Sequence, residues 1–391
     1  GVAQIGAGYR NEISPRNALL RAREFTMAEL EHFVDPEGEG PDLDRVADVE
    51  LPLYPVEAQQ ADGEEYVHLT PHEALDEGVV AGEWVAYFLA RSKQWFERVG
   101  VDMDRFRFRQ HLPGELAHYA SDCWDAEGEV DGDWVELEGV ASRTDYDLSK
   151  HDEHADDGFT VFQAYDEPKT VERATVDPEM SYLGPEFGGD AADVAEALAD
   201  LAGRDRSAFD ADEVTVEVDG EEYTVPTEKT GFEVAEETES GRHIVPHVVE
   251  PAFGVGRAVY TVLAHRYDTD EVDGETRDVL RLPAEVAPTT VGVFPLMDKD
   301  GMGEAARDLA ADLREAGVDV TYDDSGNIGR RYRRQDEVGT PYCVTVDYES
   351  LEDGTVTLRD RDTTEQTRVE LDELTELLPA LRDGDVSFGE L

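Results

Sequence analysis

Residues 9–36 read YRNEISPRNALLRAREFTMAELEHFVDP and carry the pattern that decides the fold. Arg10 precedes a loop that leads to Arg21, and Phe25 and Glu29 follow at intervals of four residues. This interval holds Arg21, Phe25 and Glu29 on one face of either a strand or a helix. Two planar guanidinium groups suit a triphosphate, and a flat aromatic ring suits a purine. The ordered set therefore predicts a nucleotide site, although a single Arg-x-Glu is usually a surface charge network.

A second candidate phosphate site follows at residues 250–257, which read EPAFGVGR. The two glycines let the backbone approach a ligand closely, and the helix predicted over 254–267 opens there with an N-terminus that favours phosphate. Taken alone, the glycines are better explained by close packing of a helix on a strand. Together with the motif in residues 9–36, the two glycines favour a phosphate-binding site.

The periodicity of the first 285 residues predicts both strands and helices. Alternation indicates strands over 1–5, 134–140 and 245–249, and helical spacing indicates helices over 70–100, up to residue 120, and over 191–202. Thr70 and Pro71 are typical of a helix start. Two alternating runs at 214–218 and 221–225 flank Asp219-Gly220, a strong hairpin signal.

The pattern changes after Pro283 and Pro288, which bracket a predicted linker. Strands are expected at 291–296, 318–322, 342–347 and 355–359, and helices at 303–316 and 371–381. Alternating elements of this length predict a small α/β domain. We place the domain boundary near residue 286.

Composition excludes several classes of protein. The chain holds 93 Asp and Glu against 34 Lys and Arg, for a net charge of −59, and only five residues are Lys. Acid spread along the whole chain with so little Lys predicts a halophilic, cytoplasmic protein whose surface is screened by molar salt. No apolar run is long enough for a membrane span, and we expect neither a membrane nor DNA as a partner. Two cysteines, Cys123 and Cys343, exclude a disulfide scaffold.

The longer text around these motifs resembles glycyl-tRNA synthetases of the archaeal and eukaryotic type, which are class II aminoacyl-tRNA synthetases. The matching stretches lie at 9–16, 23–36, 108–111, 117–120, 122–125, 136–139, 323–331 and 357–362. The resemblance implies an α/β protein of two domains. Residues 1–285 would form an α+β catalytic domain with an antiparallel sheet and an insertion at about 158–245. Residues 286–391 would form an α/β anticodon-binding domain with a mixed sheet.

The resemblance implies a two-step reaction in which glycine attacks ATP to give glycyl-adenylate, and the glycyl group then moves to tRNA(Gly). Arg10 would contact the α-phosphate, Arg21 the γ-phosphate and Phe25 the adenine, with Arg257 on the other side of ATP. Arg10 and Arg257 are the expected catalytic residues, and Glu136 is the expected ligand of Mg²⁺. The expected ATP-binding residues are Arg10, Asn11, Glu12, Leu20, Arg21, Phe25, Glu136, Leu137, Gly254, Val255, Gly256 and Arg257.

Two further groups follow from the resemblance. Glu29 and Glu250 would hold the ammonium group of glycine, with ordinary salt bridges as their alternative role. The expected glycine-binding residues are Phe25, Thr26, Glu29, Glu250, Ala252 and Gly254. The basic stretch at 329–334, for which a solvated loop is the alternative, would bind tRNA. The expected tRNA-binding residues are Arg330, Arg331, Tyr332, Arg333, Arg334, Arg359 and Arg361.

The chain departs from the family pattern in two places. Ala252 stands where the family usually has Ser, a hydroxyl that lines the glycine pocket. Motif 1 and another glycine-binding glutamate would lie upstream of Gly1, so we expect an N-terminal part, and a homodimer for the longer protein. Two alternatives stay open: another class IIa ligase, such as one for threonine, proline or histidine, and a tRNA-binding paralogue without catalysis.

Overall fold

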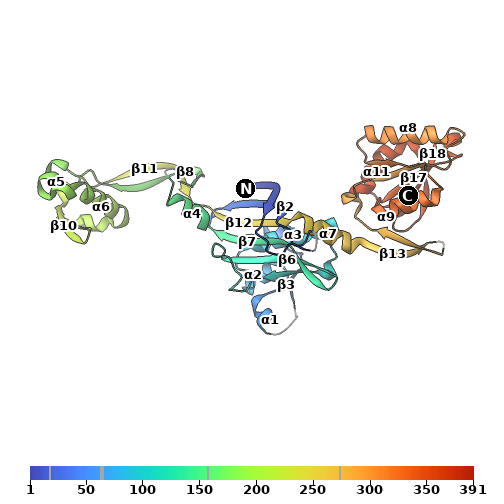
Figure 1. The fold of residues 1–391 in the computed structure, drawn as a ribbon. Helices are drawn as coiled ribbons and strands as arrows, with labels where there is room; N and C mark the ends of the chain where they lie inside the picture. Colours follow the sequence, from blue (N-terminus) through green and yellow to red (C-terminus); the bar gives the residue numbers. More distant parts are fainter. Residues whose placement is uncertain (17–18, 62–65, 156–157, 273) are drawn as a thin grey trace. The chain divides into compact units, whose positions relative to one another are not determined.

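The computed structural model describes residues 1–16, 19–61, 66–155, 158–272 and 274–391 (Figure 1). Contacts divide the chain into two compact units, one formed by residues 1–150 with 246–391 and the other by residues 151–245. The boundary predicted near residue 286 lies within the first unit and stays a prediction. Among the described helices, none is long and apolar enough to cross a membrane.

The first unit is built on an eight-stranded sheet. Its order is β1 (Val2–Tyr9), β2 (Glu24–Val34), β12 (His247–Gly254), β7 (Asp133–Thr144), β6 (Asp122–Val130), β5 (Phe106–Gln110), β3 (Leu51–Tyr54) and β4 (Val67–Leu69). All neighbours pair antiparallel except β3 and β5, which are parallel. The predicted antiparallel sheet is thus confirmed.

Helices cover one face of this sheet, here called the helix face. α3 (Glu83–Val99) and α7 (Val255–Arg266) bury Leu89, Phe96 and Val262 with Trp124 of β6 in one apolar core. α2 (Pro71–Asp76) opens on a capping box at Thr70, as predicted. The helix expected up to residue 120 is wrong, because turns around Pro113 and Gly114 replace it. Two short helices complete this part: α1 (Val56–Gln60) and α4 (Tyr146–Asp152).

The unit of residues 151–245 has its own small core. A long ribbon of β8 (Val161–Thr175) and β11 (Glu233–Ile244) leads to α5 (Met180–Phe187), α6 (Ala191–Arg204) and the hairpin β9 (Glu213–Val218) with β10 (Glu221–Pro226). Leu183, Leu198 and Phe209 are buried together there. Asp219 and Gly220 both have positive φ, so the predicted hairpin turn is confirmed.

The last hundred residues form a mixed sheet. Its order is β16 (Val320–Tyr322), β15 (Val291–Pro295), β17 (Tyr342–Val346), β18 (Thr355–Asp360) and β19 (Gln366–Glu370), parallel around β15 and antiparallel beyond β17. The helices are α8 (Met302–Glu315), α9 (Ile328–Val338), α10 (Ser350–Asp353) and α11 (Leu374–Asp383). The expected α/β domain with a mixed sheet is confirmed, whereas β19 and α9 were not predicted.

The remaining elements are short. A hairpin of β13 (Tyr267–Val272) and β14 (Glu275–Leu280) precedes the mixed sheet. The 3₁₀ turns are Leu43–Val46, Met103–Arg105, Gly188–Asp190, Arg206–Asp210, Thr227–Lys229, Ala284–Val286, Leu371–Glu373 and Phe388–Glu390.

A buried carboxylate joins the β13–β14 hairpin to the mixed sheet. Asp336 of α9 is completely buried and accepts two hydrogen bonds from Arg359 of β18, at 2.8 and 3.1 Å. Arg277 of β14, also buried, donates a third at 3.2 Å. Removing one member of such a network leaves an uncompensated charge in the interior.

We therefore expect Asp336→Asn to lower the free energy of unfolding by about 3 kcal/mol, because Arg359 loses its counter-ion inside the protein. Urea unfolding followed by circular dichroism measures this loss. The exposed neighbour supplies the control, since Glu337→Gln should leave the midpoint unchanged. Equal midpoints for Asp336→Asn and the wild type would contradict the assignment.

Candidate active site

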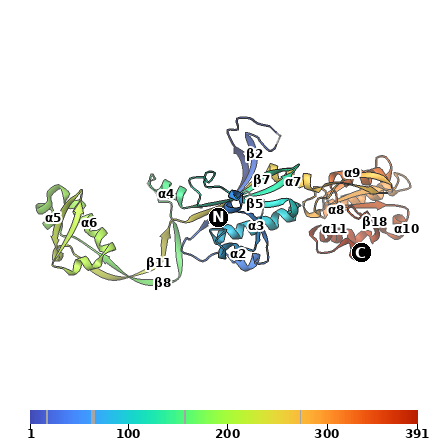
Figure 2. The same cartoon turned by 90° about the horizontal axis from the view of Figure 1, so that it is seen from below.

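Figure 2 shows α3 lying along one side of the large sheet. The opposite side, here called the polar face, carries charged side chains. Alternation along β2 places Phe25 and Glu29 on this face. The register sets Glu29 opposite Ala252 of β12, and Ala252 opposite Gly139 of β7. Gly139 in turn lies opposite Asp125 of β6. Glu29, Ala252, Gly139 and Asp125 thus form one row across four strands. The row has a carboxylate at each end and small side chains in the middle.

A β-bulge brings Glu136 onto the polar face. The register between β6 and β7 shifts by one residue there, so that Glu127 lies opposite Glu136 while Ala126 lies opposite Glu138. The extra residue, Leu137, turns its side chain into the core, where it is 1% exposed. Without the shift, strand alternation would direct Glu136 to the helix face.

Arg257, in the first turn of α7, connects this bulge to the turn between β1 and β2. Its Nη1 donates to the backbone oxygen and to Oε2 of Glu136, both at 3.0 Å. Its Nη2 donates to the backbone oxygen of Leu20 at 3.2 Å. Gly254 lies close to Leu137, because a Cβ there would be 3.5 Å from the Leu137 carbonyl oxygen. The guanidinium group is therefore held in place before any ligand binds.

The turn between β1 and β2 carries the first motif. Arg10 donates its backbone N–H to Arg23 at 2.9 Å, and its guanidinium lies 5.8 Å from the centre of the Phe25 ring. Phe25 packs over Gly8, where an added Cβ would come within 2.7 Å of the ring. Glu12 accepts the backbone N–H of Ser14 at 3.1 Å. Arg10 and Phe25 thus lie close together, while Asn11 and Arg21 are exposed on the same turn.

The Glu29 end of the row is a cluster of four carboxylates around one guanidinium group, that of Arg143. Glu29 accepts a hydrogen bond of 2.8 Å from Gln4 of β1. Glu250 of β12 pairs with Arg143 of β7, whose Nε also donates to Asp147 at 2.9 Å. Burial, followed by the negative charge of Glu250, raises the pKa of Glu31. Concentrated negative charge of this kind attracts a small cation or an ammonium group.

The sequence alone did not identify Arg143 or Glu31. Arg143 follows Gly139 and Ala141 at the strand interval of two, and this alternation was the available signal. No local sequence pattern could identify the partner of Arg143, because Glu250 lies more than a hundred residues away along the chain.

Some predicted residues turn away from the polar face. Thr26 is exposed and lies between Phe25 and Met27, so strand alternation directs its side chain to the opposite face from Glu29. Val255 lines an apolar groove on the helix face, beside Trp95 and Phe253. Contacts from the side chains of Thr26, Leu137 and Val255 are therefore excluded in this structure, which leaves only their backbone atoms for a ligand.

A buried acid lies directly behind the row. Glu138 is 1% exposed on the helix face, where its Oε1 accepts a hydrogen bond of 2.7 Å from Ser92 of α3. Its Oε2 has no hydrogen-bond partner among the described residues. Burial raises the pKa of Glu138 to about 8.

The raised pKa predicts a stability that depends on pH. The contribution of Glu138 is fully present below its ordinary value of 4.5 and is lost as the pH rises through about 8, because the folded chain must then bury a charge. Glu138→Gln should flatten this decline, as urea unfolding at a series of pH values will show. Asp133→Asn, an exposed change on the same strand, is the control that should keep the decline. An unchanged slope in Glu138→Gln would contradict the prediction.

The predicted tRNA-binding residues separate into two groups. Arg331, Arg359 and Arg361 are each 3% exposed. Arg331 donates to backbone oxygens of Pro295, Asp324 and Gly326, and Arg361 donates to those of Leu282 and Gly339.

These contacts correct the prediction for the buried group. The three guanidinium groups hold the fold together and cannot reach RNA without leaving the interior. Tyr332 is likewise turned inward, because its hydroxyl lies 2.7 Å from that of Thr345 and its ring contacts Phe294. The basic stretch forms α9 rather than a loop, and its helical period explains why only part of it faces outward.

The outward group consists of Arg330, Arg333 and Arg334. Arg330 is exposed next to the helix N-cap at Asn327, and Arg334 keeps 41% of its side chain exposed while it pairs with Asp323. Arg333 is 27% exposed beside Asp336.

Comparison with known proteins agrees with this geometry. Residues 290–381 match the family model described as an anticodon binding domain. A curated glycine–tRNA ligase of Methanothrix thermoacetophila is 46% identical over 100% of this chain and 67% of the relative. One from Archaeoglobus fulgidus is 45% identical over 100% of the chain and 68% of the relative. One from Methanothermobacter thermautotrophicus is 44% identical over 98% of the chain and 67% of the relative.

The chain thus spans about two thirds of the length of these relatives and is matched over essentially its whole own length. Identity of this degree across both the large sheet and the mixed sheet goes beyond a shared fold. The chain belongs to the glycine–tRNA ligase family of aminoacyl-tRNA synthetases.

Proposed function

We propose that this chain activates glycine with ATP and transfers the glycyl group to the 3′ end of tRNA(Gly). The observation that supports this most is the division of the polar face. One end holds Arg10, Phe25 and the Arg257–Glu136 pair, and the other holds Glu29 and Glu250 around a small-residue centre. The first end suits a nucleoside triphosphate, and the second suits an amino acid with no side chain.

The nucleotide end would work by position and charge. Phe25 offers its ring to adenine, and Arg10 beside it contacts the α-phosphate, on which negative charge grows as the glycine carboxylate attacks. Arg257 is already fixed by Glu136 and Leu20, so little reorganisation is needed when ATP binds. Because Arg21 is exposed on the turn, it has room to reach the γ-phosphate.

Magnesium fits the residues at this end. Glu136 presents a carboxylate that is 45% exposed, and its Oε2 is engaged by Arg257. One carboxylate together with substrate phosphates is a common way to hold Mg²⁺. When bound, the ion would neutralise charge on the phosphates and on the leaving pyrophosphate.

The amino-acid end would select glycine by charge and by exclusion. Glu29 and Glu250 hold the ammonium group, and Arg143 keeps Glu250 oriented. Ala252 and Gly139 form the centre of the row, where their small side chains let the substrate approach the sheet closely, and we propose that larger amino acids are rejected on steric grounds. Ala252 contributes a methyl group where the family's serine would add a hydroxyl.

The mixed sheet would bind the anticodon arm of tRNA through the outward arginines of α9. Arg330, Arg333 and Arg334 form the basic surface in an otherwise acidic chain. Because molar salt removes most of the counter-ion release that drives RNA binding, these contacts must be short-ranged. We further propose a cytoplasmic protein of a halophile, and a homodimer for the longer protein, which light scattering at high salt will test.

The test is ATP–pyrophosphate exchange without tRNA, in molar KCl with Mg²⁺, comparing glycine with alanine, serine and threonine. Exchange with glycine alone is the expected result. Exchange with another amino acid would assign the chain to a different substrate. No exchange from a sample that circular dichroism shows to be folded would favour a tRNA-binding protein without catalysis.

A further inference from the structure

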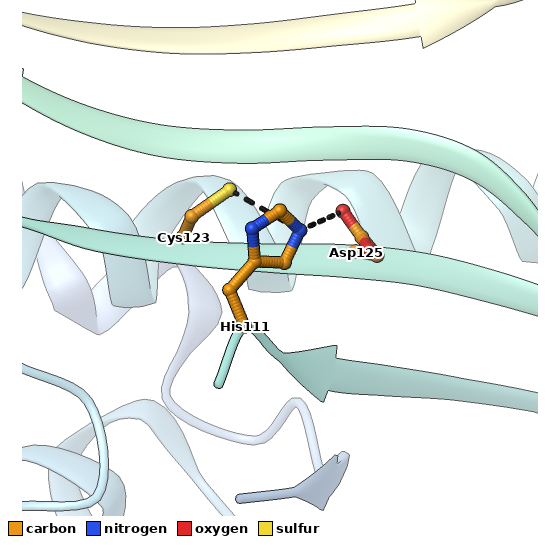
Figure 3. A group of neighbouring side chains, drawn as sticks. All are labelled: His111, Cys123 and Asp125. Atoms are coloured by element: carbon orange, nitrogen blue, oxygen red, sulfur yellow. Dashed lines mark hydrogen bonds and ion pairs between the residues drawn. The ribbon is translucent and has the colours of Figure 1, made fainter. Parts of the chain in front are cut away.

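Three side chains of different chemistry converge on the polar face at β6. Cys123 and Asp125 lie two residues apart on this strand, and His111 follows the end of the neighbouring strand β5 (Figure 3). The backbone N–H of His111 donates to the carbonyl oxygen of Cys123 at 3.0 Å, which fixes the imidazole between the other two side chains.

The donor atoms are spaced as in a metal site. His111 Nε2 lies 2.9 Å from Asp125 Oδ1 and 3.8 Å from Cys123 Sγ, and all three donor atoms lie within 4.8 Å of one another. Bonds of about 2.0 Å to nitrogen and oxygen and about 2.3 Å to sulfur put tetrahedral zinc ligands ~3.3–3.6 Å apart. The two distances from His111 Nε2 differ from these values by less than about half an ångström.

The surroundings also admit an ion. The His111 and Asp125 side chains are 23% and 13% exposed, so the cluster is shielded without being closed. His111 Nδ1 is buried and has no hydrogen-bond partner among the described residues. In the metal-free structure Nε2 donates its proton to Asp125 Oδ1 at 2.9 Å, so an ion bound between the two side chains would take the place of this proton.

We propose that His111, Cys123 and Asp125 bind one divalent transition-metal ion of the zinc class, with the fourth position open to the polar face. A thiolate and an imidazole favour such an ion over the hard cations Mg²⁺ and Ca²⁺. The site stands on the same row of the sheet as Gly139 and Ala252, but it does not depend on the reaction proposed above. The proposal is therefore tested by measuring metal binding and not by measuring activity.

The chain allows a clean spectroscopic test, because it contains only two cysteines. Cys343, the other one, is 1% exposed in β17 and is the matched control. Chain without a polyhistidine tag is freed of metal with a chelator and titrated with Co²⁺. A thiolate-bound cobalt ion gives a near-ultraviolet charge-transfer band, and exposed histidines elsewhere cannot produce it.

The expected result is a band that saturates at one Co²⁺ per chain and disappears when Zn²⁺ is added. Cys123→Ser should abolish the band, His111→Gln should weaken Co²⁺ binding by more than about 100-fold, and Cys343→Ser should change nothing. A wild-type chain without the band, or a band that survives Cys123→Ser, would overturn the proposal.

A second measurement uses the unmodified chain, so it does not depend on the variants folding. Since Cys343 is buried, Cys123 is the thiol expected to react with an alkylating reagent in the native state. Bound Zn²⁺ should slow this reaction by at least about tenfold, and a chelator should restore it. Alkylation at the same rate with and without Zn²⁺ would reject the site.

Discussion

Arg257→Ala should lower the kcat of glycine-dependent ATP–pyrophosphate exchange by about 10²–10³-fold, the loss expected when one fixed donor to developing charge is removed. The structure gives the reason in three contacts. The guanidinium group donates to two oxygens of Glu136 and to the carbonyl of Leu20, so it fixes the bulge of β7 and the β1–β2 turn together. Alanine removes both the charge and this connection.

The control for this prediction lies on the same helix. Arg266, at the end of α7, donates to the backbone oxygen of Gly100 at 2.6 Å, away from the polar face. Arg266→Ala should lower stability without a comparable loss of kcat. Arg257→Lys should recover little activity, because an ammonium group cannot make the same forked contacts. Wild-type exchange rates in folded Arg257→Ala would refute the role.

Glu250→Gln should raise the KM for glycine about 10–100-fold while the KM for ATP stays the same. The change keeps the size of the side chain and removes its charge, and a hydrogen bond to a charged group contributes about 1.5–3 kcal/mol. Glu250 is 15% exposed, so water compensates poorly for a lost contact to the ammonium group. Steady-state exchange at varied glycine concentrations measures the effect.

Asp147 provides the matched control for Glu250. Arg143 pairs with both carboxylates, and Asp147 is 41% exposed on α4. Asp147→Asn removes the outer partner and should leave the KM for glycine close to that of the wild type. A similar rise in both variants would mean that Glu250 acts by orienting Arg143 rather than by holding glycine.

The sequence by itself determined the elements whose signals are local. The hairpin at Asp219-Gly220, the helix that opens after Gly254 and the start of α2 at Thr70 all appear where they were predicted. Turn residues, caps and periodicity act over a few residues, so they can be read without the fold. The sequence motifs also sufficed to identify the family.

Only the tertiary structure decided which side chains meet. The bulge at Leu137 aims Glu136, strand alternation turns Thr26 away, and burial commits Arg331 and Arg359 to the interior of the mixed sheet. The pair of Arg143 with Glu250 and the cluster of His111 with Cys123 and Asp125 arise from strand register. Register is set by pairing between distant segments, and one residue of shift moves a side chain to the other face, so local patterns cannot specify it.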